Sequence, residues 1–232
     1  MKPETVLSSP SDAEPGSPLL DLLLGIFPRA AIKPAAVRKR SFLYRQGDPI
    51  AAIHCVIEGS VAVERLDEEG RLSMFGIMGP GAILGWQDLM ANGVHRNAAE
   101  ALSPCEVVAI PCGTFSAAMH RDVRLVEMLM RQGAEQLSAY EDHMVRLSTL
   151  ELSKRIYMTL CSFVDDAVPR QGTVDITVPL LKKDLAALLG TSPESLSRSL
   201  RRLEDMQIAE FRGRNVVRLR LGWGSDAACG AE

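Results

Sequence analysis

The sequence predicts an α+β protein in three parts: a strand-rich N-terminal region, one long central helix, and a C-terminal region of short helices with a β-hairpin. Short apolar–polar alternations separated by Gly-rich turns occupy residues 19–120. A Pro-free pattern with apolar residues three and four apart follows over 121–152, and residues 153–222 return to short elements. Residues 1–18 form a Pro/Ser/Glu-rich segment that we expect to be a flexible tail, and 223–232 form a C-terminal tail.

The composition is that of an ordinary globular protein, with 47% hydrophobic and 24% charged residues. No apolar run reaches the roughly 18 residues that a membrane span needs, and the first residues lack the basic-then-apolar pattern of a signal peptide. We therefore expect a cytoplasmic protein without a membrane partner.

The cysteines argue against a disulfide framework and against a zinc site. They are odd in number, scattered, and contain no CxxC pair. Apolar neighbours around Cys55 and Cys161 predict buried thiols that behave as small hydrophobic groups. We expect neither a metal site nor a catalytic one. The five positions are Cys55, Cys105, Cys112, Cys161 and Cys229.

Charge is distributed unevenly along the chain. The net charge is −3, yet residues 179–221 contain nine Lys/Arg and five Asp/Glu, so this stretch carries +4 and the remainder −7. A basic C-terminal unit on an acidic body is the asymmetry expected where one domain contacts phosphate.

The N-terminal region predicts a β-barrel, sandwich or roll after a short helix near Leu19–Phe27. The turns QGDP (46–49), DEEG (67–70) and GPGAILG (79–85) separate strand-like runs. In the run 59–66, apolar Val61, Val63 and Leu66 alternate with polar positions.

The central helix predicts a dimer seam, because a helix this long exceeds what one small β-domain can cover. A partner helix is the simplest way to bury the apolar stripe that runs along this helix. The alternative is that the helix packs on its own domain, and the polar interruption of the stripe at Gln132 and Gly133 keeps this alternative open. The expected interface residues are Leu125, Leu129, Gln136, Tyr140, Met144 and Leu147.

The C-terminal region predicts a winged helix-turn-helix. Residues 181–190, LKKDLAALLG, form a short helix ended by Gly190. The next helix starts at Ser192 and Pro193, since Ser is a favoured N-cap and Pro is tolerated at the first helical position. Residues 211–221, FRGRNVVRLRL, predict a two-stranded wing that turns at Gly213.

The second helix has a face suited to contacting DNA bases. Leu196, Leu200 and Leu203 share the core side, whereas Glu194, Ser197 and Arg198 lie on another side near the N-terminus. Arg can donate twice to guanine and Glu can accept from cytosine. The alternative is a solvated Glu194–Arg198 ion pair. The expected phosphate contacts are Lys182, Ser192, Arg201, Arg202, Arg212 and Arg214.

Across residues 19–221 the sequence resembles the CRP/FNR superfamily of bacterial transcription regulators. The resemblance rests on RQGDP, IEGSVAVERLDEEGR, GPGAILG, the long helix and DLAALLGTSPESLSRSLRRLED, in that order. It implies a cyclic-nucleotide-binding-type β-roll, a central dimerisation helix and a homodimer on a palindromic operator. The ESLSR segment is similar to the FNR-like signature, which implies TTGA-type half-sites and an activator that contacts RNA polymerase.

The resemblance leaves the effector open. A cAMP-binding roll of this family places Gly-Glu on the ribose and Arg-Ser on the phosphate, whereas here Trp86 and Gln87 follow Gly85, and Asn97 follows Arg96. The N-terminal cysteine cluster of an iron–sulfur sensor is missing. Haem would need an axial ligand, and the candidates are His54, His95, His120 and His143. The remaining alternative is a FixK-like regulator without a small effector, controlled by its abundance or by cysteine oxidation. The possible effector pocket comprises Gly85, Trp86, Gln87, Arg96, Asn97 and Tyr140.

Two other classes of function fit less well. An enzyme is disfavoured because GPGAILG has the wrong spacing for a dinucleotide loop and no HExxH, GxSxG or P-loop motif occurs. A nucleotide-regulated interaction module without DNA binding would not need the Glu194, Ser197 and Arg198 face or the basic wing.

Overall fold

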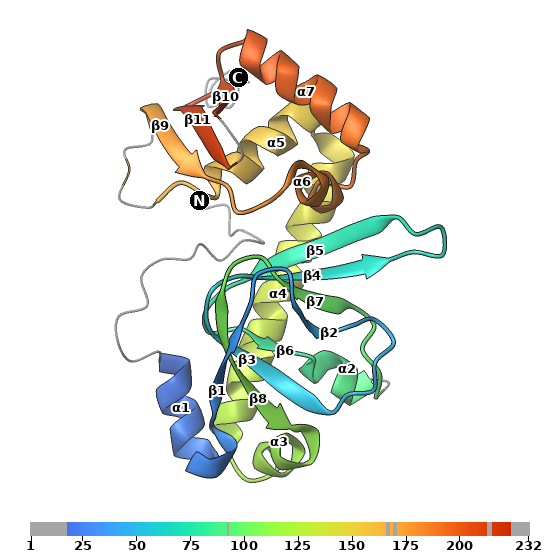
Figure 1. The fold of residues 1–232 in the computed structure, drawn as a ribbon, viewed down its shortest axis with the longest axis vertical. Helices are drawn as coiled ribbons and strands as arrows, with labels where there is room; N and C mark the ends of the chain where they lie inside the picture. The colour runs from blue at the N-terminus through green and yellow to red at the C-terminus, as the bar shows by residue number, and fades with distance from the viewer. Residues whose placement is uncertain (1–17, 92, 166–167, 169–170, 213–214, 224–232) are drawn as a thin grey trace, which may run out of the picture. The chain divides into compact units, whose positions relative to one another are not determined.

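The computed structural model describes residues 18–91, 93–165, 168, 171–212 and 215–223. The chain divides into two compact units, residues 1–141 and 142–232. The α+β class expected from the sequence is confirmed (Figure 1). Gly213 and Arg214 lie outside the described residues, as do residues 1–17 of the predicted N-terminal tail and 224–232 of the predicted C-terminal tail.

The first unit is built around two four-stranded antiparallel sheets, ordered β1-β8-β3-β6 and β2-β7-β4-β5. Strands rich in Val, Ile and Ala supply the apolar faces that pack between the sheets. The other face of the β1-β8-β3-β6 sheet packs against helices. The strands are β1 (Pro34–Val37), β2 (Phe42–Tyr44), β3 (Ala52–Glu58), β4 (Val61–Leu66), β5 (Leu72–Met78), β6 (Ile83–Leu84), β7 (Ala98–Ala101) and β8 (Cys105–Pro111).

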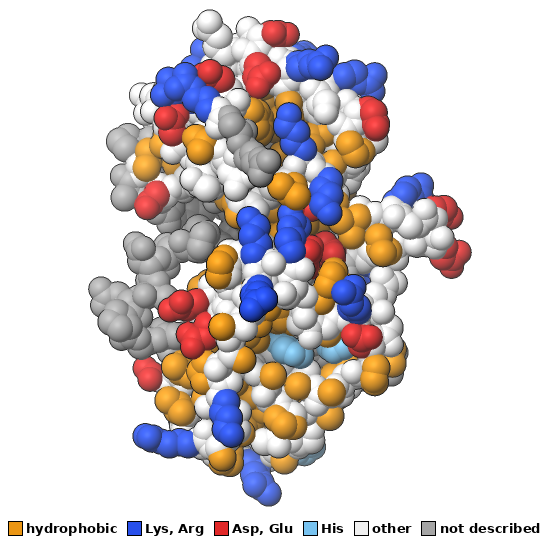
Figure 2. All heavy atoms as spheres, viewed as in Figure 1, with side chains coloured by type: hydrophobic (Ala, Val, Ile, Leu, Met, Phe, Trp, Pro, Cys, Tyr) orange, Lys and Arg blue, Asp and Glu red, His pale blue; other side chains and the backbone are white. Residues whose placement is uncertain are grey.

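Strand β4 departs from the simple alternation that its sequence predicts. Val61 and Val63 are buried as expected, but Leu66 is 52% exposed and Glu64 is buried. A bulge between Val63 and Glu64, where β4 pairs with β5, changes which side chains face the core. Beyond it the β4–β5 hairpin projects from the sheets (Figure 1), and its tip carries charged groups, with Arg71 paired to Asp67 and Glu69 (Figure 2).

Helices close the first unit: α1 (Pro18–Ile26), the 3-10 turn η1 (Arg29–Ala31), α2 (Trp86–Ala91), α3 (Cys112–Met119) and the long α4 (Val123–Thr149). Leu23 of α1, Phe115 of α3 and Leu125 of α4 are fully buried in one shared core. Because this core includes residues of α4, the first turns of the long helix belong to the β-roll.

The second unit is a three-helix cluster with a three-stranded sheet of order β10-β11-β9. Its core is formed by Ile156, Leu160, Leu185, Leu196, Leu203 and Leu219. The elements are α5 (Leu152–Cys161), β9 (Gly172–Thr177), α6 (Lys182–Leu188), α7 (Pro193–Asp205), β10 (Ala209–Arg212) and β11 (Val216–Leu221). Helix α6, a short turn, helix α7 and the β10–β11 hairpin follow the order that the sequence predicts.

Candidate nucleic-acid interface and effector site

The turn between α6 and α7 is fixed by a glycine and a cap. Gly190 adopts φ +59°, a left-handed conformation that ends a helix without the strain a side chain brings. The Thr191 N–H then donates to Ala186 O at 3.0 Å. At the start of α7, Ser192 Oγ accepts from the Ser195 N–H at 3.2 Å, with Pro193 at the first helical position. The predicted cap is confirmed.

The start of α6 uses a cap that sequence inspection missed. Leu181 stands at the N-cap and offers no polar side chain. Instead, Asp184 in the first turn accepts a hydrogen bond from the Leu181 N–H at 3.1 Å. A carboxylate near a helix N-terminus is also favoured by the helix dipole. The signal was present in LKKD, three residues after the cap.

Helix α7 separates an apolar face from a polar one. Leu196, Leu200 and Leu203 are at most 3% exposed and pack into the domain. Glu194, Ser197 and Arg198 are exposed, near the helix N-terminus. The predicted division of this helix into two faces is therefore present in the structure.

The polar groups of that face have short-range partners within α7. Ser197 Oγ donates to Pro193 O at 2.8 Å, and Arg198 Nη2 donates to Ser195 Oγ at 3.2 Å. A hydrogen bond from its own backbone N–H, helped by Ser192 and the nearby charge of Arg198, lowers the pKa of Glu194. Within the described part of α7 no ion pair joins Glu194 to Arg198, so Arg198 keeps donors for another acceptor.

The residues expected to contact phosphate differ in the contacts that they make within the protein. Lys182 lies over the Phe211 ring, with Nζ 5.7 Å from its centroid. Arg202 approaches Glu151 at 3.8 Å and Arg212 pairs with Glu210 at 2.8 Å. Ser192 and Arg201 are exposed. Surface pairs of this kind are weak and exchange readily for a phosphate.

The six residues expected to form an effector pocket make contacts with other groups of the protein. Trp86 is 8% exposed and faces the core, where its ring lies beside Gly133 of α4. Gln87 Nε2 donates to Gln136 at 2.6 Å. Arg96 is paired with Asp88, and Asn97 Oδ1 accepts from Arg65 at 3.0 Å. Gly85 has φ +89° and lies against the His95 ring.

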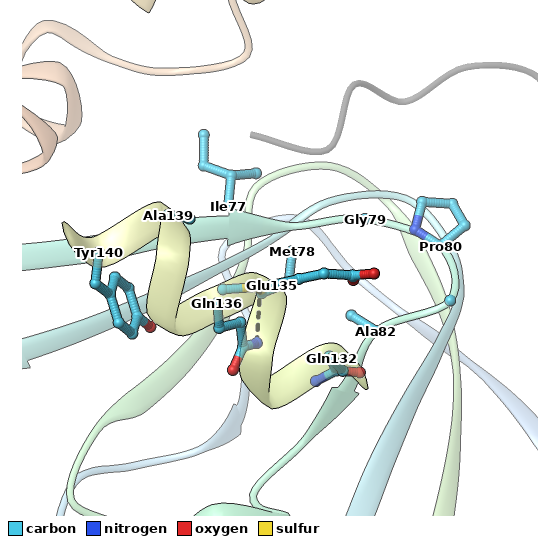
Figure 3. A pocket seen from close by; sticks show the side chains of 11 residues that line it. Ile77, Met78, Gly79, Pro80, Ala82, Gln132, Glu135, Gln136, Ala139 and Tyr140 are labelled. Carbon is cyan, nitrogen blue, oxygen red and sulfur yellow. Dashed lines mark hydrogen bonds between the residues drawn. The ribbon is translucent and has the colours of Figure 1, made fainter. Parts of the chain in front are cut away.

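A hollow of about 310 Å³ lies elsewhere, between α4 and the β5–β6 turn (Figure 3). Helix α4 forms one wall through Gln132, Glu135, Gln136, Ala139 and Tyr140, and the turn around Gly79–Ala82 forms the other. Of the six predicted pocket residues, Tyr140 alone lines it.

The buried face of α4 corrects two residues of the predicted dimer seam. Leu125 and Leu129 are 0% and 3% exposed within the β-roll core, so they are not available to a partner chain. Gln136 bonds to Gln87, and Tyr140 packs edge-on against Phe75. Met144 remains 65% exposed and Leu147 39% exposed. Leu125 and Leu129 are therefore covered by the chain's own domain, whereas Met144 and Leu147 are exposed and their place in a dimer seam stays a prediction.

The residues that interrupted this stripe have specific packing roles. The Ile83 N–H donates to Gln132 Oε1 at 2.9 Å, and Gln132 Nε2 donates back to Ile83 O at 2.8 Å. A Cβ at Gly133 would lie 3.3 Å from the Trp86 ring, so glycine leaves room for it. Both residues attach α4 to the β-roll.

Comparison with known proteins identifies the family. A family model described as "Cyclic nucleotide-binding domain" matches residues 35–122, and one described as "Crp-like helix-turn-helix domain" matches 123–221. The chain belongs to the CRP/FNR family. This regulator is therefore not an enzyme but a transcription regulator with a helix-turn-helix DNA-binding domain.

Individual relatives agree with this assignment. The regulator is 25% identical over 179 residues to the cAMP-activated global transcriptional regulator CRP of Salmonella typhimurium, covering 77% of this chain and 85% of that one. It is 25% identical over 178 residues to the nitrogen fixation regulation protein FixK of Azorhizobium caulinodans, covering 74% and 69%. The structure of FixK2 from Bradyrhizobium japonicum matches with a TM-score of 0.69 and 25% identity, covering 87% of this chain and 98% of that one.

The thiols and histidines of the regulator are mostly enclosed. Cys55 and Cys105 are buried and Cys112 and Cys161 half-buried, all four unbridged. Burial raises the pKa of the Cys55 thiol to about 12. Within the described ranges no cluster of three His, Cys, Asp or Glu side chains is arranged to hold a metal ion, and no helix there has the length and apolar character to traverse a bilayer.

The half-buried His54 and the buried His95 should make stability depend on pH. Burial, with a smaller contribution from His95, lowers the pKa of His54 from its ordinary 6.5 to about 4, and burial also lowers that of His95. Between those pKa values the unfolded chain binds a proton that the folded chain does not. The contribution of His54 is thus complete above pH 6.5 and is lost as the pH falls toward 4.

We therefore expect the free energy of unfolding in urea to fall between pH 7.5 and 5, with His54 contributing about 2 kcal/mol of the loss. His54→Gln should flatten this dependence. His120→Gln, which removes an exposed imidazole, should leave the dependence as it is. Equal pH dependence in all three proteins would contradict the assignment to His54.

Proposed function

We propose that the regulator binds a palindromic operator with TTGA-type half-sites as a homodimer, in the cytoplasm, and activates transcription by contacting RNA polymerase. In this proposal residues 19–120 form a sensor-type β-roll, residues 121–152 a dimerisation helix and residues 153–222 a DNA-binding domain. The observation that carries the proposal is the exposed Glu194, Ser197 and Arg198 face at the capped end of α7.

Base contact is assigned to this face because of its donors and acceptors. Arg198 presents a planar fork of donors that suits guanine O6 and N7. An ionised Glu194 can only accept hydrogen bonds, and its lowered pKa keeps it in that form. Ser192, Lys182, Arg201, Arg202 and Arg212, together with Arg214, are assigned to phosphate, where they fix the position of α7 without reading sequence.

Dimer formation is assigned to the exposed side of α4. Val123, Met130, Leu137 and Met144 recur every seven residues and are 66%, 61%, 59% and 65% exposed. An apolar repeat of seven residues is the spacing by which two helices pair. A second copy of the same chain provides the matching stripe, and a two-fold dimer matches a palindromic site.

The test is fluorescence anisotropy with a TTGAT-NNNN-ATCAA duplex and a scrambled duplex of the same length. Arg198→Ala should weaken binding to the first duplex by about 1–3 kcal/mol and reduce the ratio between the two affinities. Arg220→Ala removes an equally exposed cation of the same domain from outside α7, and should leave that ratio near the value of the unaltered protein. An unchanged ratio in Arg198→Ala would reject its role as a base reader.

A further inference from the structure

Asp88 and Arg96 form an ion pair at the place in the β-roll where Arg96 was expected to face a ligand phosphate. Arg96 Nε donates to Asp88 Oδ1 at 2.9 Å, and the Arg96 backbone N–H donates to Oδ2 at 3.1 Å. The Asp88 side chain is 8% exposed and that of Arg96 is 53% exposed. The carboxylate is therefore enclosed, while the cation reaches the surface.

Both of these donors are ones that a phosphate group would use. A guanidinium and an adjacent backbone N–H are typical partners of phosphate oxygens. Asp88 accepts hydrogen bonds from both donors through its carboxylate, which is negatively charged like a phosphate and offers similarly placed oxygens. An anionic ligand would have to displace this carboxylate and leave it buried without its cation, which is strongly unfavourable.

The groups around the pair are also packed against protein. The His95 ring stacks on Tyr44 with centroids 3.7 Å apart, and it lies so close to Gly85 that a Cβ there would be 2.9 Å from it. His95 Nδ1 is 3.9 Å from Asp88 Oδ2. Asn97, the next residue after Arg96, is held by Arg65. The site is thus filled from both sides without a bound molecule.

We propose that Asp88 is a specificity-determining residue: it serves as an internal counter-anion for Arg96 and prevents the β-roll from binding phosphate-bearing ligands such as cyclic nucleotides. The same contacts join α2 to the loop that carries Arg96. The ion pair therefore also holds these two segments together, as a bound anion would otherwise do. Removing the carboxylate should convert Arg96 into an anion site.

The experiment titrates the full chain with a fluorescent cyclic AMP analogue and follows its anisotropy. Asp88→Ala should bind the analogue roughly tenfold or more tightly than the unaltered chain, because a charge-assisted pair no longer competes. The gain should disappear in Asp88→Ala/Arg96→Gln. Asp48→Asn is the matched control: it removes an exposed carboxylate that also lies near His95, without touching the Arg96 pair.

Either of two binding results would overturn the proposal: binding of the analogue to the unaltered chain that depends on Arg96, or a folded Asp88→Ala that binds no more tightly than the unaltered chain. Should Asp88→Ala fail to fold, Asp88→Ser provides a smaller change. The unaltered chain offers a further test, since its Arg96 Nε–H resonance should not move when the analogue or inorganic phosphate is added. Movement of that resonance at saturating ligand would equally reject the assignment.

Discussion

Leu137→Glu should convert the regulator from a dimer to a monomer and lower its affinity for a palindromic operator by about a hundredfold or more, because the two half-sites then bind independently. Leu137 is 59% exposed within its own chain, so the fold has no need of its side chain. A carboxylate placed in an apolar seam between two α4 helices would be buried without a partner charge. Sedimentation velocity measures the first effect and anisotropy with the operator duplex the second.

The control for this prediction is Arg131→Gln. Arg131 is exposed on the same helix, about 100° around the axis from Met130, and its substitution changes the net charge by the same amount. It should leave both sedimentation and operator affinity close to those of the unaltered protein. A Leu137→Glu protein that still sediments as a dimer would show that the seam lies on another surface.

The helix-turn-helix could be predicted from the sequence because its signals are local. Ser192, Pro193 and Gly190 each act within one turn of where they stand. The spacing of Leu196, Leu200 and Leu203 then separates the buried face of α7 from the exposed one. No distant part of the chain needs to be known for these inferences.

Which face of the long helix is buried could not be predicted in the same way, since two apolar stripes run along it. One, with Leu125 and Leu129, is covered by the β-roll; the other, with Met130 and Leu137, remains exposed. Both satisfy a helical period, and the choice between them depends on which strands pack against α4. Periodicity shows that a helix has apolar faces but does not say what covers each of them.

The contacts within the predicted effector region could not be inferred from the sequence for a related reason. The sequence shows Arg96 and the residues around it, and it does not show that Asp88 of α2 folds back to pair with it. Likewise Gln87 and Gln136 lie 49 residues apart in sequence and meet only through the tertiary fold. Polar residues that look available in a motif are therefore poor evidence for a pocket until their partners are known.

Gly59→Ala should destabilise the β-roll by about 3–5 kcal/mol, a large part of the stability of a typical domain. Gly59 has φ +88°, a conformation that costs other residues about 1–2 kcal/mol. A Cβ at this position would also lie 2.4 Å from Pro104 O and 2.6 Å from Cys105 Sγ. Since one obstacle is the backbone oxygen of Pro104, just before β8, a side-chain rotation cannot relieve the overlap.

Gly70→Ala separates the cost of the backbone conformation from the cost of the steric overlap. Gly70 has φ +76° at the tip of the β4–β5 hairpin, with no atom within 4 Å of the Cβ position, so this variant carries the conformational cost alone. Its free energy of unfolding in urea should fall by about 1 kcal/mol. If Gly59→Ala lost no more than Gly70→Ala, the close packing of β3, β4 and β8 around Gly59 would be contradicted. A larger loss, accompanied by failure to bind the operator, would show that the turn between β3 and β4 holds the two sheets together.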